Sequence, residues 1–342
     1  MKRPFPIGVV APSSIVPQVE FQIALERLRA SGVEPVVHPA VKKRDFVFAG
    51  STEERARAFF DYAHDSRFDV IWSARGGYGA NHLLPYLDRW TAEEGKPRRK
   101  LLVGYSDVTV LHAFVADRWG WDCLHAPMPA SKSFLLMKKP DWKCALEWVQ
   151  RRAQTATWQG KRLKFIGAKP KTDVDGLLVG GNLAVWNSLL GTPYAPVYEP
   201  EGGRGKILFL EDIAESVSRI DRMIQQLEQA RGFRNVRAIV LGDFLDCGDS
   251  SPMFLAKAPK PARVEGALKN PKPAELKPLR AKFAQAKAFQ EIFGALGDRL
   301  GIPVAVGLPA GHGPNYTPLP LQADYKLSAS GKFELLSWSW LS

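Results

Sequence analysis

Short apolar runs alternate with amphipathic helical patterns over the first 125 residues, and this alternation limits the fold more than any other feature of the chain. The expected strands are 7–11, 35–38, 70–74 and 101–105, and the expected helices are 18–30, 51–64, 80–87 and 107–119. Strands and helices that alternate in this way form a parallel sheet covered on both faces. Ligands bind such sheets beyond the C-terminal strand ends, where the loops gather. We therefore expect an α/β domain whose functional residues follow its strands.

The second half of the chain shows a similar pattern. Its expected strands are 206–210, 236–241, 302–306 and 333–338, and its expected helices are 182–190, 213–229 and 288–300. At roughly 150 residues per domain, a chain of 342 residues predicts about two domains. We expect an N-terminal domain at 1–130, a C-terminal domain at 176–342, and between them a connection, 131–175, that is rich in Lys, Trp and Pro.

Two segments match the capping box, in which a side chain before a helix and a Glu three residues later each accept a backbone N–H. Ser51 and Glu54 predict that a helix begins after Ser51. Asp212 and Glu215 predict that another helix follows Asp212 directly. The apolar face of this second helix is expected to contain Val217, Ile220, Ile224 and Leu227.

Composition places the chain among globular proteins. Apolar residues make up 45% and charged residues 24% of it, and no run approaches the ~18 apolar residues of a membrane-spanning helix. Cys123, Cys144 and Cys247 lie far apart without metal-ligand spacing, so neither a disulfide framework nor a metal site is expected. The N-terminal apolar run is broken by Pro4 and Pro6, which argues against a secretory signal. We expect a cytoplasmic protein without membrane partners.

The net charge of +12 is concentrated in one segment. Residues 251–287 contain nine Lys or Arg against two acidic residues, together with six prolines. Such a segment is expected to be an extended or mobile surface insertion, which we place at 251–282. It can attract phosphates, anionic lipid or acidic ligands, or it can simply be a solvated loop. No nucleic-acid-binding motif accompanies it, so no nucleic acid is expected as a partner.

Ser106 lies in GYSDV, between an expected strand and an expected helix. A serine on such a turn projects its hydroxyl above the sheet, where the helix N-terminus favours developing negative charge. The pattern G-x-S-x-G is only partly met, because Val108 replaces the last glycine. Serine is also a favoured N-cap, so the residue is either a nucleophile or a cap.

Two further polar residues follow strands in the second half. Glu211 ends the apolar run ILFLED and either orients a histidine or forms an ordinary salt bridge. His312 lies between two glycines, which suit a presented imidazole better than a packed one. His125 is the competing base, whereas His112 lies within the helix after Ser106 and should point elsewhere.

The segment RGGYG at 75–79 follows the third expected strand. A glycine-rich turn can hold phosphate, but the G-x-G-x-x-G and Walker patterns are absent. Its backbone N–H groups can instead form half of an oxyanion hole, the other half being the N–H after Ser106. A plain tight turn is the alternative.

Five motifs occur in order along the chain: SARGGYGANHLLPYLD at 73–88, GYSDVT around Ser106, LLVGGNLAVWNSLLGTP at 177–193, ILFLED at 207–212 and GLPAGHGPN at 307–315. Together they resemble the LD-carboxypeptidases, a serine-peptidase family that also contains microcin-immunity peptidases. The resemblance spans residues 7 to about 325. It implies a flavodoxin-like parallel-sheet N-terminal domain and a smaller mixed β/α C-terminal domain.

The resemblance also implies a Ser–Glu–His triad at Ser106, Glu211 and His312. His312 would take the proton of Ser106, whose hydroxyl attacks the scissile carbonyl, while Glu211 holds the imidazole. The implied reaction removes the terminal D-alanine from murein tetrapeptides during cell-wall recycling, after an L-configured centre of a diamino acid. The implied enzyme is a cytoplasmic homodimer without a metal or another cofactor.

Three supporting groups complete this expectation. The backbone N–H groups of Asp107 and Gly77 are expected to bind the oxyanion. Arg75 is a candidate for recognising the terminal carboxylate, with a structural ion pair as the alternative.

Three departures from the family pattern are present, of which the insertion bears on the substrate more than on the reaction class. Ala126 and Gln322 stand where the family usually has glycine, and 251–282 is an insertion relative to the common pattern.

Alternative functions remain open at this stage. One is an immunity-type amidase that cleaves a peptidyl-nucleotide toxin, in which Trp142 or Trp186 stacks on the base. Another is a non-catalytic module that binds acidic partners through the basic insertion. A glutamine-amidotransferase-like enzyme is disfavoured, because no cysteine lies at a strand-to-helix turn.

Overall fold

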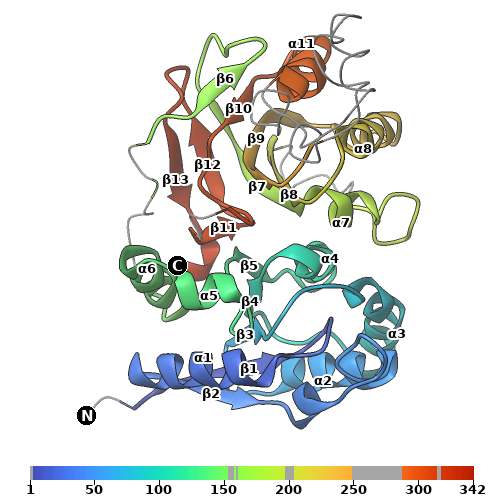
Figure 1. The fold of residues 1–342 in the computed structure, drawn as a ribbon, viewed down its shortest axis with the longest axis vertical. Helices are drawn as coiled ribbons and strands as arrows, with labels where there is room; N and C mark the ends of the chain where they lie inside the picture. The colour runs from blue at the N-terminus through green and yellow to red at the C-terminus, as the bar shows by residue number, and fades with distance from the viewer. Residues whose placement is uncertain (1–2, 153–157, 159–160, 197–203, 249–286, 314–316) are drawn as a thin grey trace, which may run out of the picture.

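A computed structural model of the chain describes residues 3–152, 158, 161–196, 204–248, 287–313 and 317–342 (Figure 1). Its strands are β1 (Phe5–Val10), β2 (Val33–Val37), β3 (Val70–Ser73), β4 (Leu101–Gly104), β5 (Asp122–His125), β6 (Lys164–Ile166), β7 (Val174–Asn182), β8 (Lys206–Ile213), β9 (Val236–Leu245), β10 (Val304–Val306), β11 (Leu319–Leu321), β12 (Asp324–Leu327) and β13 (Phe333–Ser337). The basic insertion expected at 251–282 lies outside the described residues.

The helices are α1 (Gln18–Ala30), η1 (Pro39–Lys42), α2 (Thr52–His64), η2 (Ala80–Leu83), α3 (Leu84–Glu94), η3 (Ser106–Val108), α4 (Thr109–Phe114), η4 (Val115–Trp119), α5 (Lys132–Leu136), α6 (Lys139–Val149), α7 (Leu183–Asn187), α8 (Val217–Gln229), η7 (Gln290–Gly294), α11 (Ala295–Leu300) and η8 (Ser339–Leu341). The Ser51–Glu54 capping box is present at the start of α2, as expected.

The first sheet has the strand order β2-β1-β3-β4-β5-β11. Strands β1 to β5 pair in parallel, which is the flavodoxin-like arrangement expected for the N-terminal domain. Every residue of β3, β4 and β5 is buried. Because alternate side chains of a strand point to opposite faces, the centre of this sheet is covered on both sides.

The second sheet is mixed, with the order β13-β12-β7-β8-β9-β10-β6. Strands β7 to β10 are parallel, and antiparallel strands flank them at both edges. This is the mixed β/α second domain that the sequence predicts. Helix α8 buries the four residues of its expected apolar face.

The chain passes between the two sheets more often than the expected boundaries allow. Strand β11, which lies in the second half of the sequence, pairs antiparallel with β5 and so belongs to the first sheet. The expected connection 131–175 contains α5, α6 and β6, and β6 pairs with β10 in the second sheet. Figure 1 shows β11 beside β5 where the two halves of the molecule meet.

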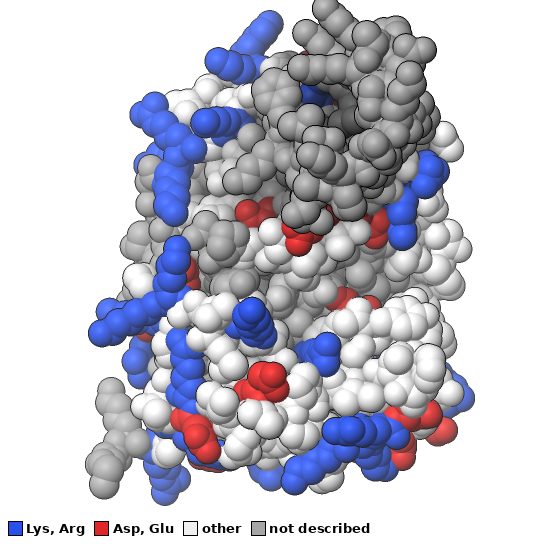
Figure 2. Space-filling model, viewed as in Figure 1, with Lys and Arg blue, Asp and Glu red and all other residues white. Residues whose placement is uncertain are grey.

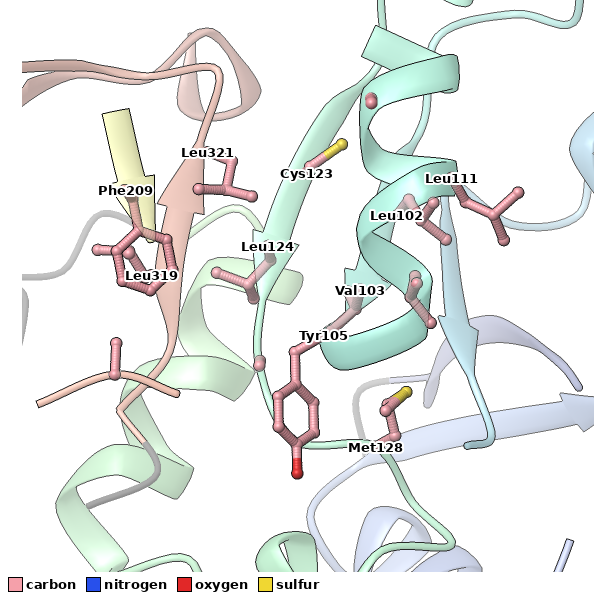
Figure 3. Close-up of a cluster of buried hydrophobic side chains, with 14 of the residues drawn as sticks. Leu102, Val103, Tyr105, Leu111, Cys123, Leu124, Met128, Phe209, Leu319 and Leu321 are labelled. Carbon is pink, nitrogen blue, oxygen red and sulfur yellow. The ribbon is translucent and has the colours of Figure 1, made fainter. Parts of the chain in front are cut away.

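Apolar side chains from both sheets fill this junction. In Figure 3, Leu319 and Leu321 of β11 lie near Phe209 of β8, and Leu124 lies on the neighbouring strand β5. All four are buried. The two sheets therefore share one continuous core, and the edge of the first sheet is fixed against β8.

The helix expected to follow Asp212 begins later than the sequence predicts. Strand β8 continues to Ile213, and α8 begins at Val217, with the hydroxyl of Ser216 accepting the N–H of Arg219. The capping-box prediction for Asp212 and Glu215 is therefore wrong. The pairing of β8 with β9 extends past Asp212, so this residue is part of a strand when the helix starts.

Charged side chains are scattered over the face drawn in Figure 2. Lys and Arg lie mostly around its edges, and several Asp and Glu lie along its middle. The described basic side chains form no single stripe on this face. No helix within the described ranges is long and apolar enough to cross a membrane.

The close approach of Gly181 to Thr109 predicts a strong effect of a small substitution. A Cβ at Gly181 would lie 2.6 Å from Oγ1 of Thr109, so Gly181→Ala should overpack the junction at a cost of about 1–3 kcal/mol. Gly191 also has a positive φ but has open space around it, so Gly191→Ala is the matched control for backbone strain. Thermal melting should show a larger loss of Tm for Gly181→Ala, partly restored by Thr109→Ala. Equal losses in the two glycine variants would contradict the packing argument.

Candidate active site

Ser106 lies on a strained turn directly beyond a strand of the first sheet. Strand β4 ends at Gly104, and Ser106 begins η3 with a φ of 62°. This left-handed conformation is uncommon for a residue with a side chain and suits a nucleophile held above a strand-to-helix turn. Tyr105 occupies the cap position of η3, so Ser106 is not the cap that the alternative interpretation predicts.

Glycines beside Ser106 leave room for neighbouring side chains. A Cβ at Gly104 would lie 2.8 Å from Cγ1 of Val108, and a Cβ at Gly76 would lie 3.2 Å from that of Ser106. The glycine turn, residues 76–79, is therefore packed directly against Ser106.

Two side chains hold the glycine turn in place. The carboxylate of Asp107 accepts the N–H of Ala80 at 2.9 Å, and the hydroxyl of Ser14 accepts the N–H of Tyr78 at 3.1 Å. Gly77 has a φ of 107°, and a Cβ there would overlap the Ser14 side chain. The residue after Ser106 thus fixes the backbone that faces it.

Two arginines also bind the backbone near this turn. Nη1 of Arg75 donates to the carbonyl of Ile15 at 2.7 Å, so the expected carboxylate-binding residue has a main-chain partner. Arg55 is 1% exposed and donates to the carbonyl of Gly79 at 2.8 Å. Arg55 is not among the functional residues expected from the sequence. Its position could have been recognised in the sequence, because Arg55 is a charged residue on the apolar face of the expected helix 51–64, one turn before Phe59.

Glu211 and His312 form a buried hydrogen-bonded pair. Glu211 is fully buried near the end of β8, and its Oε2 lies 2.7 Å from Nδ1 of His312. Burial alone would raise the pKa of Glu211, but the charge of His312, its hydrogen bond to Glu211 and the nearby His125 imidazole lower it to about 2. Burial alone would lower the pKa of His312, but the Glu211 carboxylate raises it. Each partner favours the charged form of the other.

Neighbouring carboxylates require a glycine on each side of His312. Gly311 has a φ of 127°, and a Cβ there would lie 3.0 Å from Cβ of Glu211. A Cβ at Gly313 would overlap the carboxylate of Asp243. The N–H of Asp243 also donates to the backbone of this loop at 2.8 Å. The glycines therefore permit both the backbone path and the close packing that present the imidazole.

Of the other histidines, His125 and His112 differ in their relation to Glu211. His125, at the end of β5, is 2% exposed, and its Nε2 lies 3.6 Å from Oε1 of Glu211. This is the carboxylate oxygen that His312 does not contact. His112 is buried within α4, where burial lowers its pKa to about 3. In the described part of the chain, no hydrogen bond or ion pair joins His112 to Glu211.

Tyr105 contacts both histidine rings beside Glu211. It directly precedes Ser106, and its ring centroid lies 4.7 Å from that of His312 and 5.5 Å from that of His125. Ser106 therefore directly follows a side chain that packs on the His312 ring.

Two further carboxyl groups lie near the pair. Burial and the charge of Glu211 raise the pKa of Asp243 to about 6. Burial also raises the pKa of Asp212 to about 6, although Asn182 and Ala184 donate hydrogen bonds to it. Within the described ranges, no group of three or more His, Cys, Asp and Glu side chains is placed to hold a metal ion.

The contact between Glu211 and His312 predicts a shifted titration of the imidazole. In an NMR titration, we expect His312 to lose its proton above the ordinary histidine pKa of about 6.5. Glu211→Gln should lower this pKa, because the imidazolium loses its negative partner and remains buried. Asp243→Asn should lower it less, since Asp243 acts at a longer range. A wild-type pKa at or below the ordinary value would contradict the pairing.

Two family models match the chain. The LD-carboxypeptidase N-terminal domain matches residues 7–126, and the LD-carboxypeptidase C-terminal domain matches residues 175–327. A Streptomyces coelicolor protein named as a carboxypeptidase is 35% identical over 246 residues, which are 70% of this chain and 75% of that one. The murein tetrapeptide carboxypeptidase of Pseudomonas aeruginosa is 27% identical over 90% of this chain and 88% of its own. The microcin C7 self-immunity protein of Escherichia coli is 28% identical over 70% of this chain and 75% of its own length.

Solved structures resemble the whole fold. The muramoyltetrapeptide carboxypeptidase from Oxalobacter formigenes superposes with a TM-score of 0.69 at 27% identity, over 96% of this chain and 97% of that one. The microcin self-immunity protein in complex with glutamyl sulfamoyl guanosine has a TM-score of 0.71 at 22% identity, over 100% of this chain and 98% of that one. The chain therefore belongs to the LD-carboxypeptidase family and is a serine-type carboxypeptidase.

Proposed function

We propose that this enzyme releases the terminal D-alanine from murein tetrapeptides through a triad of Ser106, Glu211 and His312. The observation that carries the proposal is the buried 2.7 Å contact between Glu211 and His312, in the neighbourhood of a serine with a φ of 62°. A carboxylate, an imidazole and a strained serine at one place are the parts that acyl transfer requires.

Acylation uses the two nitrogens of His312 differently. Nδ1 is bonded to Glu211, so Nε2 is the atom that takes the proton of Ser106. The Ser106 oxygen attacks the scissile carbonyl, and the resulting imidazolium is stabilised by the Glu211 carboxylate. The imidazolium then gives its proton to the amine of the leaving D-amino acid, and an acyl-enzyme remains. In deacylation, His312 activates a water in the same way, which frees Ser106.

The oxyanion of each tetrahedral intermediate is proposed to bind the N–H groups of Asp107 and Gly77. Each such donor typically contributes about 3 kcal/mol to the stabilisation of the transition state. The Asp107 carboxylate supports this arrangement, because it holds the N–H of Ala80 and so fixes the end of the glycine turn. Asp107 would then supply one donor through its backbone N–H and position the other through its carboxylate.

Arg75 is our candidate for binding the terminal carboxylate of the substrate. Its bond to the carbonyl of Ile15 orients the guanidinium and uses only part of its five N–H donors. A purely structural role for this bond is the alternative.

The substrate class is supported by the relatives. Proteins named as murein tetrapeptide and muramoyltetrapeptide carboxypeptidases match 90% and 96% of this chain. We further propose a cytoplasmic homodimer that acts in cell-wall recycling without a cofactor, as the family resemblance implies.

An immunity-type amidase is the second candidate, favoured by the similarity to the microcin C7 self-immunity protein. The stacking residues considered for it do not fit. The rings of Trp142 and Trp186 are buried, and Arg27 covers Trp142 at 4.4 Å from its centroid. A base would therefore need another aromatic partner. Binding of acidic partners through the insertion 251–282 stays a prediction.

Ser106→Ala should abolish hydrolysis while the protein remains folded, because the variant loses only the attacking oxygen. We expect kcat to fall on the order of 10⁴-fold or more, and Glu211→Gln and His312→Ala to fall by similar orders. Double variants with Ser106→Ala should be little worse than Ser106→Ala alone, since triad members act as a unit. Circular dichroism and thermal melts control for folding. Losses that multiply in the double variants would argue against a shared triad.

A panel of substrates separates the two candidate functions. Wild-type protein should release D-alanine from a murein tetrapeptide, and mass spectrometry would detect the tripeptide product. A glutamyl sulfamoyl adenylate should be cleaved with a kcat/KM at least tenfold lower. The reverse order would support the immunity-type amidase. The Ser106→Ala protein, which lacks the nucleophile under either function, controls for contaminating hydrolases.

A further inference from the structure

The carboxylate of Glu211 has two oxygens in different environments. Oε2 is bonded to His312, whereas Oε1 lies 3.6 Å from Nε2 of His125, just beyond the usual length of a hydrogen bond. Both Oε1 and this Nε2 are buried, and neither has another hydrogen-bond partner among the described residues. Each atom therefore needs a partner, and the two lie 3.6 Å apart.

A fully buried carboxylate oxygen without a hydrogen-bond partner would lower the stability of the folded protein. Burying a polar atom without a hydrogen bond destabilises the folded state, and burying a charged group without one destabilises it more. The carboxylate torsion of Glu is also broad, so one bond to His312 leaves the group free to rotate. A second donor on Oε1 removes both problems, since it satisfies the oxygen and fixes the plane of the carboxylate.

His125 is itself held firmly. Strand β5 pairs with β4 and with β11, and His125 is opposite Gly104 on one side and Leu319 on the other. Its ring packs edge-on against Phe209 and Tyr105, at 5.2 and 5.5 Å between centroids. The imidazole is therefore a fixed donor rather than a mobile one.

The position of His125 connects the two sheets of the site. Ser106 follows β4 in the first sheet, and His125 ends the adjacent strand β5. Glu211 is on β8 in the second sheet. A bond from His125 to Glu211 therefore sets the distance between the nucleophile's sheet and the acid.

We propose that His125 is a positioning residue whose Nε2 donates to Oε1 of Glu211, so that Oε2 stays on Nδ1 of His312. The inference rests on the proposed triad. It assigns His125 no contact with the substrate and no proton transfer, which separates it from the competing base that the sequence suggested.

The charged and titratable groups around these rings come from several elements. Those near His312 are Glu211 and Asp212 of β8, Asp243 of β9 and Tyr105 before η3. Those near His125 are Glu211, Tyr105 and His112 of α4. Of these, only Glu211 forms an ion pair or hydrogen bond with either ring within the described residues. A change at His125 should therefore reach the charge of His312 through Glu211, because Tyr105 contacts both rings by packing alone.

The test compares His125→Leu with His112→Leu, the same substitution at a second histidine of equal exposure, 2%. With the murein tetrapeptide, His125→Leu should lower kcat by about 10- to 100-fold and leave KM within twofold, because small misplacements of catalytic groups cost up to about 10²-fold. His112→Leu should leave kcat within about threefold. His125→Gln, whose amide nitrogen can take the place of Nε2, should restore most of the rate.

The pH profile supplies a readout that a merely structural role would not move. Glu211 raises the pKa of His312, so a carboxylate that turns away should shift the acid limb of kcat/KM to lower pH. In the substrate-free protein, the low-field NMR signal of the His312 Nδ1–H should broaden or move in His125→Leu and persist in His125→Gln. An acid limb that stays in place or moves to higher pH would overturn the positioning role, as would equal loss of kcat in His112→Leu.

Two further comparisons keep the outcome decisive. If His125→Leu does not fold, His125→Asn replaces it, because its shorter side chain cannot carry a donor to the Nε2 position. Retention of wild-type kcat and pH profile by folded His125→Asn would then overturn the proposal. Failure of the wild-type protein to hydrolyse the tetrapeptide would count against the proposed function instead, and the NMR comparison would still test the contact between His125 and Glu211.

Discussion

A fully buried carboxylate is costly unless charged or hydrogen-bonded partners compensate for the lost water, and Glu211 is such a group at the junction of two sheets. His312 lies 2.7 Å from one of its oxygens and His125 lies 3.6 Å from the other. His125 ends β5 of the first sheet, Glu211 is on β8 of the second, and His312 lies in the loop between β10 and β11, so the same carboxylate both holds the base and joins the two halves of the molecule. Water that entered a loosened junction would weaken both contacts, because the attraction between charges falls as the local dielectric rises.

The close approach of the sheets is built into the backbone around Glu211. Strand β11 leaves the second half of the chain to pair with β5, and its leucines enter the core shared with β8. On the other side of the site, Gly181 leaves room for Thr109, whose hydroxyl accepts the N–H of Asn182 at 3.1 Å. These contacts place the strand ends that precede Ser106 and carry His125 against the strand that carries Glu211. The catalytic geometry is therefore a property of the interface rather than of either sheet alone.

Local sequence signals predicted local structure well. Ser51 and Glu54 form the expected capping box, and all four strands expected in the first half of the chain lie within two residues of their predicted positions. The same signal failed at Asp212, because pairing with a strand distant in the sequence carries β8 past it. Each candidate triad residue was recognisable as a polar group after a strand, but only the family resemblance joined them. The contact of His125 with Glu211 was not predictable, since it depends on how two sheets pack.

The carboxyl groups around His312 show why the contact to a single glutamate matters. Between pH about 2 and 6, Glu211 is ionised while Asp212 and Asp243, with pKa values raised to about 6, still hold protons. Above that range all three carry charge, and the two aspartates add to the raised pKa of His312. The negative charges of these three carboxylates favour the imidazolium that forms as Ser106 loses its proton. The imidazole must be neutral to act as a base. Because the same charges raise its pKa, the neutral form becomes available only at higher pH. By keeping one carboxylate in contact and the other two further away, the fold favours the charged intermediate and limits how far the resting base is shifted.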